Sequence, residues 1–516
     1  SAIAFAQAPM KVAKSEVAMK FGNTITVDDL KEDLTILASD ALEGRETGKR
    51  GQKMAAAFIE STFRDLGLQP VVKNGNKMSY FQEVELVATK PGDIYLKIGD
   101  ETLKNLEGGL AYSGTGQDTP EIPVEIVYGG TGSEAELAGL DLTNKGLVIV
   151  QADRINIRNT SKYAYGKGAK MIFAVNQDSN EKFDEYIKKY AHYLTNERLG
   201  LATAESGSPA GNFYIKPSVA EKLTKTSMEK LLKTNESFKS GKANAYTKIK
   251  GNKASFKLGV EKREVLSENV LGYLEGTDLK DEIVIITAHY DHVGVNNGKV
   301  YNGADDDGSG TVGLLEIAEA FSMAKAEGYG PRRSILFMPV TGEEKGLLGS
   351  AYYAEHPVFP FENTVVDLNI DMIGRIGNRN FETEEYVFLV GADKLSQELH
   401  DISEEVNKTY TNLHLDYTYN DEDHPERIYY RSDHWNFAKN NIPIIFYYNG
   451  SHADYHKDTD TVDKIEFDLL KKSHLSLCEE LLDKELASTK IKLNEVKFAT
   501  AILLIEHFLF FYIFTI

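Results

Sequence analysis

Residues 282–292 read EIVIITAHYDH, and this stretch decides the fold class. An apolar run without polar alternation is typical of a strand buried on both faces of an α/β sheet. Such sheets gather their ligands outside the carboxyl ends of the strands, and this run ends at His289. Asp291 follows two residues later, so in extended chain its carboxylate points the same way and can orient the imidazole.

Four further stretches combine the end of an apolar run with side chains that can bind metal. They are YNGADDDGSG (301–310), FMPVTGEEKGLLGS (337–350), VVDLNIDMIGR (365–375) and IPIIFYYNGSHADYHKDTDTVDKI (442–465). Helical patterns such as residues 309–328 lie between the apolar runs. Residues 250–485 therefore predict an α/β domain that carries the chemistry.

Two of these stretches hold adjacent carboxylates. Three consecutive Asp residues, 305–307, repel one another unless cations neutralise them. The alternating pattern of an EF-hand is absent, so one Asp that bridges two metals fits better than a calcium loop. Glu343 and Glu344 diverge as neighbours, so one can bind metal while the other acts as general base.

The other two stretches supply one carboxylate and one imidazole. Asp371 ends an apolar run, where a carboxylate is costly unless it is paired or metal-bound, and Asp367 is the alternative on that run. His456 follows the last apolar run, with His452 as a nearby competitor.

Together these stretches offer two imidazoles and three carboxylates in one domain. Three carboxylates and a bridging hydroxide would balance the charge of two Zn²⁺ ions, as a two-metal hydrolase requires. The chain has no H-E-x-x-H and no G-x-S-x-G, which argues against a single-zinc thermolysin-like site and a serine hydrolase.

The bulk composition excludes some classes of function. The 516 residues suggest two or three domains, and a net charge of −20 argues against nucleic-acid binding, which needs a basic surface. Cys478 is the one cysteine, so an intrachain disulfide and a cysteine-rich zinc site are both excluded.

The ordered motifs resemble a known family. HYD, GADDDGSG, GEEKGLLGS, NIDMIG and DYHKDTDTVDKI are similar to motifs of the co-catalytic di-zinc aminopeptidases of the bacterial leucyl aminopeptidase type, which include glutamate carboxypeptidase II and the transferrin receptor. Residues 37–70 resemble the family's usual opening, and NFYIKPSVAEKL (212–223) resembles part of its protease-associated insert. The resemblance implies the zinc exopeptidase fold, an α/β fold whose mixed, mostly parallel central sheet is flanked by helices, with a β-rich protease-associated domain inserted.

The resemblance also implies roles for individual residues. His289 and Asp371 would bind one Zn²⁺, Glu344 and His456 the other, and Asp306 would bridge both. The peptide bond between Asp306 and Asp307 would be cis. The catalytic residues would be Glu343 as general acid and base, Asp291 orienting His289, and Tyr455 stabilising the oxyanion.

We therefore expect a zinc-dependent exopeptidase that releases N-terminal amino acids from peptides through a metal-bridging hydroxide. A carboxypeptidase or dipeptidase of the same fold would need a basic pocket for the terminal carboxylate. A glutaminyl cyclase works with one zinc, and a binding protein like the transferrin receptor loses ligands, so the complete ligand set argues against both. The acidic stretch 420–426 mildly favours recognition of an amine.

The expected domain organisation has five parts. They are an export-signal remnant or flexible N-terminus (1–22), the first part of the peptidase domain (23–104), the protease-associated-like insert (105–245), the main peptidase part (246–486) and an apolar tail of uncertain origin (487–516). The small-residue start favours a secreted or periplasmic protein. We expect no membrane association, because Glu506 and His507 interrupt the short apolar tail. The sequence does not indicate an oligomeric state.

Overall fold

The computed structural model describes residues 14–114, 118–150, 154–203, 211–241, 246–378, 383–421 and 423–482. The chain forms two compact units, one of residues 1–84 and 266–516 and the other of residues 85–265. The division falls inside strands β3 (Phe81–Pro91) and β13 (Val260–Val270). The bounds 105–245 and the protease-associated character of the insert stay predictions.

The expected terminal segments lie mainly outside the described residues. These are residues 1–13 of the proposed export signal and the whole apolar tail, 487–516. Within the first segment, α1 (Glu16–Gly22) forms a helix that Ser15 caps, and its Phe21 is buried. Residues 16–22 therefore belong to the folded unit. No helix in the described part of the chain has the length and apolar character needed to cross a membrane.

The first unit is built on a seven-stranded mixed sheet. Its strands are, in order, β14 (Gly272–Leu274), β18 (Arg333–Val340), β15 (Leu279–His289), β19 (Thr364–Ile370), β22 (Ile444–Tyr448), β20 (Tyr386–Val390) and β21 (His414–Asp416). Neighbours from β18 to β22 pair in parallel. β14 pairs antiparallel with β18 and β20 antiparallel with β22, whereas β20 and β21 pair in parallel. The prediction of a mixed, mostly parallel sheet is confirmed.

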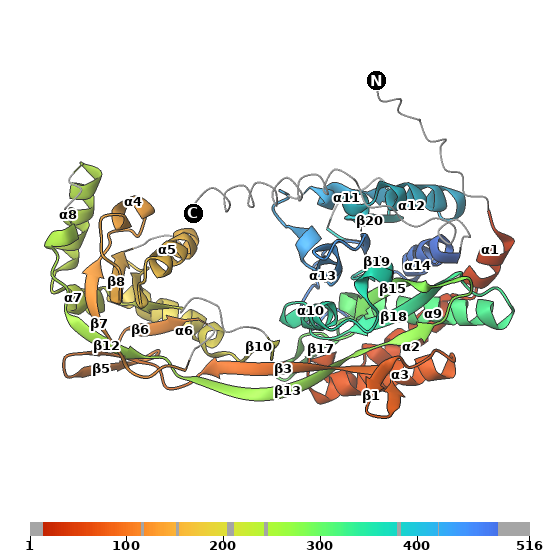
Figure 1. Ribbon diagram of the computed structural model, residues 1–516, viewed down its shortest axis with the longest axis horizontal. Coiled ribbons are helices and arrows are strands. Elements are labelled where there is room, and N and C mark those ends of the chain that lie inside the picture. Colours follow the sequence, from red (N-terminus) through yellow and green to blue (C-terminus); the bar gives the residue numbers. More distant parts are fainter. Residues whose placement is uncertain are drawn as a thin grey trace, which may run out of the picture. The chain divides into compact units, whose positions relative to one another are not determined.

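Helices cover both faces of this sheet (Figure 1). Val284 and Ile286 of β15 share a core with α2 (Val27–Leu37), α3 (Arg50–Asp65), α9 (Gly310–Ala326), α12 (Gln397–Tyr410) and α14 (Phe467–Leu482). The alternate residues Ile283 and Ile285 share a second core with α10 (Leu348–Glu355) and α13 (His434–Ala438). Burial on both faces explains why the strand sequences are continuously apolar.

The predicted helices near the N-terminus are both present. In α2, Leu30, Leu34 and Leu37 recur at helical spacing and are fully buried, and the Thr26 hydroxyl accepts a hydrogen bond from the backbone N–H of Asp29 at 3.1 Å. In α3, Ile59 and Phe63 form the corresponding apolar face. The turn between the two helices contributes Leu42 to the same apolar core.

Glu316 is a carboxyl group within the core face of α9, with only 5% of its surface exposed. Burial, together with the charges of Glu319 and Asp29, raises the pKa of Glu316 from 4.5 to about 8. A carboxyl with a higher pKa in the folded state opposes folding as it ionises, so this group lowers stability as pH rises from about 4.5 through about 8. We expect Glu316→Gln to raise the free energy of unfolding above pH 8 by up to about 5 kcal/mol, because each pH unit between 4.5 and about 8 contributes about 1.4 kcal/mol.

Thermal denaturation of the Glu316→Gln variant at pH 5 and pH 9 tests this prediction. The stabilisation should be present at pH 9 and nearly absent at pH 5. An equal change at both values would show that ionisation of Glu316 is not the cause.

The second unit contains an eight-stranded sheet of its own. The strands are, in order, β5 (Glu101–Lys104), β4 (Tyr95–Ile98), β12 (Lys253–Lys257), β7 (Ile122–Tyr128), β8 (Lys145–Val150), β9 (Met171–Val175), β11 (Asn212–Ile215) and β6 (Leu110–Ser113). Its helices include α5 (Arg154–Gly166), α6 (Asn180–Thr195), α7 (Pro217–Thr224) and α8 (Met228–Lys239). None of the predicted site residues lies in this unit.

Candidate metal centre

The predicted site residues follow the carboxyl ends of four parallel strands. His289 is the last residue of β15, Asp371 follows β19 directly, and Glu343 comes three residues after β18. His456 lies in the loop after β22, and Asp306 lies in the short turn η3 (Ala304–Ser309) that leads into α9. The parallel pairing of these strands brings their carboxyl ends to one edge of the sheet, as the sequence predicts.

Asp306 lies at the centre of this group, with its two carboxylate oxygens facing different histidines. Oδ1 is 3.2 Å from Nε2 of His289, and Oδ2 is 3.1 Å from Nε2 of His456. On the first side, His289 Nε2 is also 3.6 Å from Asp371 Oδ1. On the second side, His456 Nε2 is 3.0 Å from Glu344 Oε2. This arrangement is the one expected of a carboxylate that bridges two metal ions.

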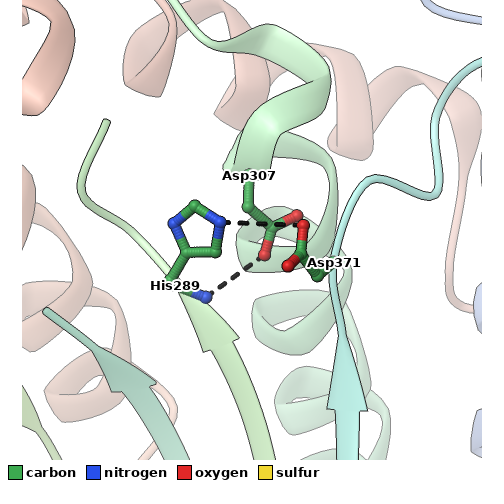
Figure 2. Close-up of side chains that lie close together, drawn as sticks. All are labelled: His289, Asp307 and Asp371. Atoms are coloured by element: carbon green, nitrogen blue, oxygen red, sulfur yellow. Dashed lines mark hydrogen bonds and ion pairs between the residues drawn. The ribbon is translucent and has the colours of Figure 1, made fainter. Parts of the chain in front are cut away.

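The surroundings of Asp307, the next residue, differ from those of Asp306. Figure 2 shows its side chain beside His289 and Asp371, where it accepts the backbone N–H of His289 at 3.2 Å. It also accepts the backbone N–H groups of Gly310 at 2.9 Å and Met372 at 3.1 Å. These bonds join the ends of β15 and β19 to the start of α9. The peptide bond between Asp306 and Asp307 is cis.

The imidazole of His289 is oriented by a backbone carbonyl group. Its Nδ1 lies 3.0 Å from the carbonyl oxygen of Asp291 and 3.8 Å from that residue's Oδ1. A carbonyl oxygen only accepts, so we assign the hydrogen to Nδ1, which leaves the Nε2 lone pair directed at Asp306 and Asp371. The expected contact through the Asp291 carboxylate is thus replaced by one through its carbonyl, because β15 ends at His289 and the chain turns there.

The Asp291 carboxylate instead positions the turn that carries Glu343. Its Oδ1 accepts the backbone N–H of Glu343 at 3.1 Å, and its Oδ2 accepts the hydroxyl of Thr47 at 2.7 Å. The Glu343 carboxylate approaches His289 Nε2 to 3.9 Å. In the metal-free protein, burial raises the pKa of Glu343 well above its ordinary value, and the charges of Glu344 and Asp371 act in the same direction.

The structure places the two alternatives to the predicted ligands away from Asp306. His452 Nε2 lies 3.1 Å from Asp305 Oδ2. Asp367 is buried within β19 and accepts the hydroxyl of Thr287 at 3.0 Å. His456 and Asp371 are therefore the members of these two pairs that reach the centre.

His292 is a residue of the centre that the sequence analysis missed. It is fully buried, and its Nδ1 lies 2.9 Å from Glu344 Oε1 and 3.9 Å from Asp306 Oδ2. The signal was visible, because His292 ends the same HYDH segment as His289. However, the sequence of a turn that follows a strand does not show in which direction each side chain points.

Several buried polar atoms of the centre have no hydrogen-bond partner among the described residues. They are His289 Nε2, His292 Nδ1, Asp306 Oδ2 and Glu344 Oε1. Burial of such atoms costs free energy unless a charge or a hydrogen bond compensates it. Imidazole nitrogens and carboxylate oxygens are the ligands that zinc takes in proteins, so this donor set fits a metal site.

Two carboxylates, those of Asp306 and Glu344, lie beside the imidazole of His456. Burial lowers the pKa of His456, but its contacts with Asp306 and Glu344 outweigh that effect and raise it to about 10. A metal ion at this position would take the place of the proton, as metal binding at histidine generally does.

A pocket adjoins the centre within the first unit, with an empty volume of about 360 Å³ including its open mouth. Asp306, Glu343 and Asp371 contribute three carboxylate groups to its lining. The remaining walls are largely apolar or aromatic, and they consist of Met372, Ile428, Phe446, Tyr448 and Tyr455 with Ser432, Ser451 and Arg431. The Tyr455 ring stacks on His456 at a centroid distance of 4.0 Å, and its hydroxyl lies 3.4 Å from Nη2 of Arg431.

A buried arginine in the turn between α2 and α3 supports the loops of the centre. Arg45 has 1% of its surface exposed, and its guanidinium donates to the carbonyl oxygens of Leu37, Tyr290, Asn302 and Gly303 at 2.7–2.9 Å. Three of these carbonyls, those of Tyr290, Asn302 and Gly303, belong to the segment between β15 and α9 that carries Asp306. Arg45 was not among the residues predicted from the sequence.

The residues of the centre lie within a segment of the chain that matches a known family. Residues 269–480 match peptidase family M28, and this range includes every predicted metal ligand and Glu343. This segment therefore matches an M28 domain, in agreement with the family resemblance.

Curated relatives match over part of the chain. Aminopeptidase YwaD of Bacillus subtilis is 34% identical over 110 residues, which are 21% of this chain and 22% of that protein. A glutamate carboxypeptidase 2 homolog of Caenorhabditis elegans is 33% identical over 127 residues, 24% of this chain and 16% of that protein. The matched segments thus span less than a quarter of either relative.

A solved structure matches over nearly the whole chain. The aminopeptidase from Aneurinibacillus sp. strain AM-1 is 20% identical, with a TM-score of 0.53, and the match covers 92% of this chain and 97% of that one. This likeness confirms the expected fold.

Proposed function

We propose that the protein is a zinc-dependent aminopeptidase that removes N-terminal residues from peptides. The observation that carries the proposal is the position of Asp306, whose two carboxylate oxygens face His289 and His456 on opposite sides. Asp371 completes the first side and Glu344 the second. The M28 domain and the aminopeptidase relatives support the same function.

The residues of the pocket have separate roles in this proposal. Two Zn²⁺ ions held by the five ligands would polarise the scissile carbonyl and acidify the attacking water. Glu343, which lines the pocket, accepts the proton of that water and returns it to the leaving amine. Asp291 holds the backbone of Glu343, and the hydroxyl of Tyr455 donates to the developing oxyanion.

Arg431 favours a second candidate, a carboxypeptidase of the same fold. Its guanidinium lines the pocket and could bind the terminal carboxylate of a peptide, as the sequence analysis requires of a carboxypeptidase. The three carboxylates that line the same pocket offer the opposite charge, which suits an α-amine. The acidic stretch 420–426 does not decide between them, because residue 422 lies outside the described residues.

A matched set of peptides distinguishes the two candidates. We expect the purified protein to cleave free-amine peptides and aminoacyl amides, to lose this activity with a zinc chelator and to regain it when zinc is restored. Blocking the N-terminus by acetylation should abolish cleavage, whereas amidation of the C-terminus should not. Cleavage of N-acetylated peptides with a free carboxylate would overturn the aminopeptidase proposal and favour the carboxypeptidase. Cyclisation of N-terminal glutamine without hydrolysis would indicate a glutaminyl cyclase.

A further inference from the structure

His292 lies on the second side of the centre, opposite His456 across the carboxylate of Glu344. Its Nδ1 is 2.9 Å from Glu344 Oε1, while His456 Nε2 is 3.0 Å from Glu344 Oε2. The two imidazole rings are 5.8 Å apart and nearly perpendicular, at 71°. Both rings therefore approach one small space that Asp306 Oδ2 also borders.

The contact between His292 and Glu344 is short, yet it is not an aligned hydrogen bond. Neither Nδ1 of His292 nor Oε1 of Glu344 has a hydrogen-bond partner among the described residues, although both atoms are buried. Asp306 Oδ2 is in the same condition. These three buried atoms lie close together, and no hydrogen bond joins them. A cation between them would compensate the free-energy cost of their burial. These three residues also form a group whose ligand atoms lie within 4.8 Å of one another.

The ring of His292 is held in this place by its backbone and by a glycine. Its backbone N–H donates to the carbonyl oxygen of Arg45 at 3.3 Å. Gly303, in the left-handed conformation at φ +56°, lies so close that a Cβ atom there would come within 2.5 Å of the His292 ring. The imidazole therefore has little freedom to turn away from Glu344.

We propose that His292 is an additional protein ligand of the second zinc ion, through Nδ1. This inference rests on the proposed two-metal function and extends it. Zinc–ligand bonds of 2.0–2.2 Å place tetrahedral ligand atoms about 3.3 Å apart. The distances from His292 Nδ1 to Glu344 and Asp306, 2.9 and 3.9 Å, lie on either side of that value.

The extra imidazole makes the two metal positions unequal. The second ion receives His292, His456, Glu344 and Asp306, whereas the first receives His289, Asp371 and Asp306. Four protein groups with two imidazoles hold an ion more tightly than three groups with one. The second position is therefore the tighter one, and the first is the one from which zinc exchanges.

The decisive measurement counts imidazoles in the full-length protein loaded with one zinc per chain. X-ray absorption spectroscopy at the zinc edge is expected to show two imidazole ligands on that ion. A single imidazole would overturn the proposal. This measurement needs no variant and no peptidase activity.

Two substitutions separate a ligand from a hydrogen-bonding residue that only orients Glu344. In zinc titrations, His292→Ala should lower the affinity of the tighter binding step by more than about 100-fold. Removal of a residue that only hydrogen-bonds a ligand lowers metal affinity by at most about 100-fold. His292→Asn keeps a donor near the position of Nδ1, so it would restore an orienting hydrogen bond without restoring the ligand. We expect both variants to lose the tight step, and wild-type affinity in His292→Asn would overturn the proposal.

Cobalt substitution supplies a spectroscopic readout. The visible absorption of the protein with one Co²⁺ per chain should change in both variants, since it depends on the number and kind of ligands, and an unchanged spectrum would contradict the proposal. Thermal unfolding of the metal-free proteins controls for folding. Tight binding of two zinc ions without peptidase activity would refute the proposed function and leave the inference on His292 intact.

Discussion

Replacement of Glu343 by Gln is expected to lower kcat by about 10²- to 10⁴-fold, the range of a general base in catalysis. The amide keeps the shape of the side chain but cannot accept the proton of the attacking water. Glu343 does not belong to either ligand group, so the zinc content should stay at the wild-type value. Kinetics on an aminoacyl amide together with metal analysis of the same sample check both parts.

Glu32→Gln, an exposed position on α2, is the matched control and should keep wild-type kinetics. Loss of zinc from the Glu343→Gln variant would show that Glu343 binds metal, and the roles of Glu343 and Glu344 would then have to be exchanged. Unchanged kcat with full zinc occupancy would remove Glu343 from the mechanism.

Asp306→Ala is expected to have the largest effect on metal binding. Because one carboxylate serves both sides of the centre, its removal should weaken both binding steps, each by more than about 100-fold. Activity should fall to background even when zinc is added in excess. Elemental analysis after dialysis and calorimetric titration with zinc measure this directly.

Asp307→Asn is the informative comparison for Asp306→Ala. Asp307 accepts three backbone N–H groups, and an amide would turn a donor toward one of them, so we expect a loss of about 1–3 kcal/mol in stability. Zinc stoichiometry should be unchanged. If Asp307→Asn loses zinc while Asp306→Ala retains it, the assignment of the bridging residue is wrong.

Much of the fold could be predicted from the sequence because burial leaves a clear pattern. The strand that ends at His289 is continuously apolar, and the leucines of α2 recur at helical spacing. The order of the motifs also predicted that their side chains meet, since parallel strands bring their carboxyl ends to one edge. The position of Asp306 between both histidines could be predicted only from the family resemblance.

The parts that could not be predicted depend on turns. The orientation of His289 through a carbonyl oxygen requires the exact course of the chain after β15, which apolar periodicity does not describe. His292 enters the centre for the same reason. Arg45 is distant in sequence, and a lone arginine in a glycine-containing loop has no pattern that would distinguish it from a solvated one.

The guanidinium of Arg45 has a consequence for how the peptidase unit can be divided. A fragment limited to residues 269–480 would retain all the metal-binding side chains, yet it would lack the cation that satisfies the carbonyls of Tyr290 and Gly303. Arg45 reaches Tyr290 across 245 positions of sequence. The segment 269–480 is thus an incomplete fold by itself, and the turn between α2 and α3 supplies its internal support.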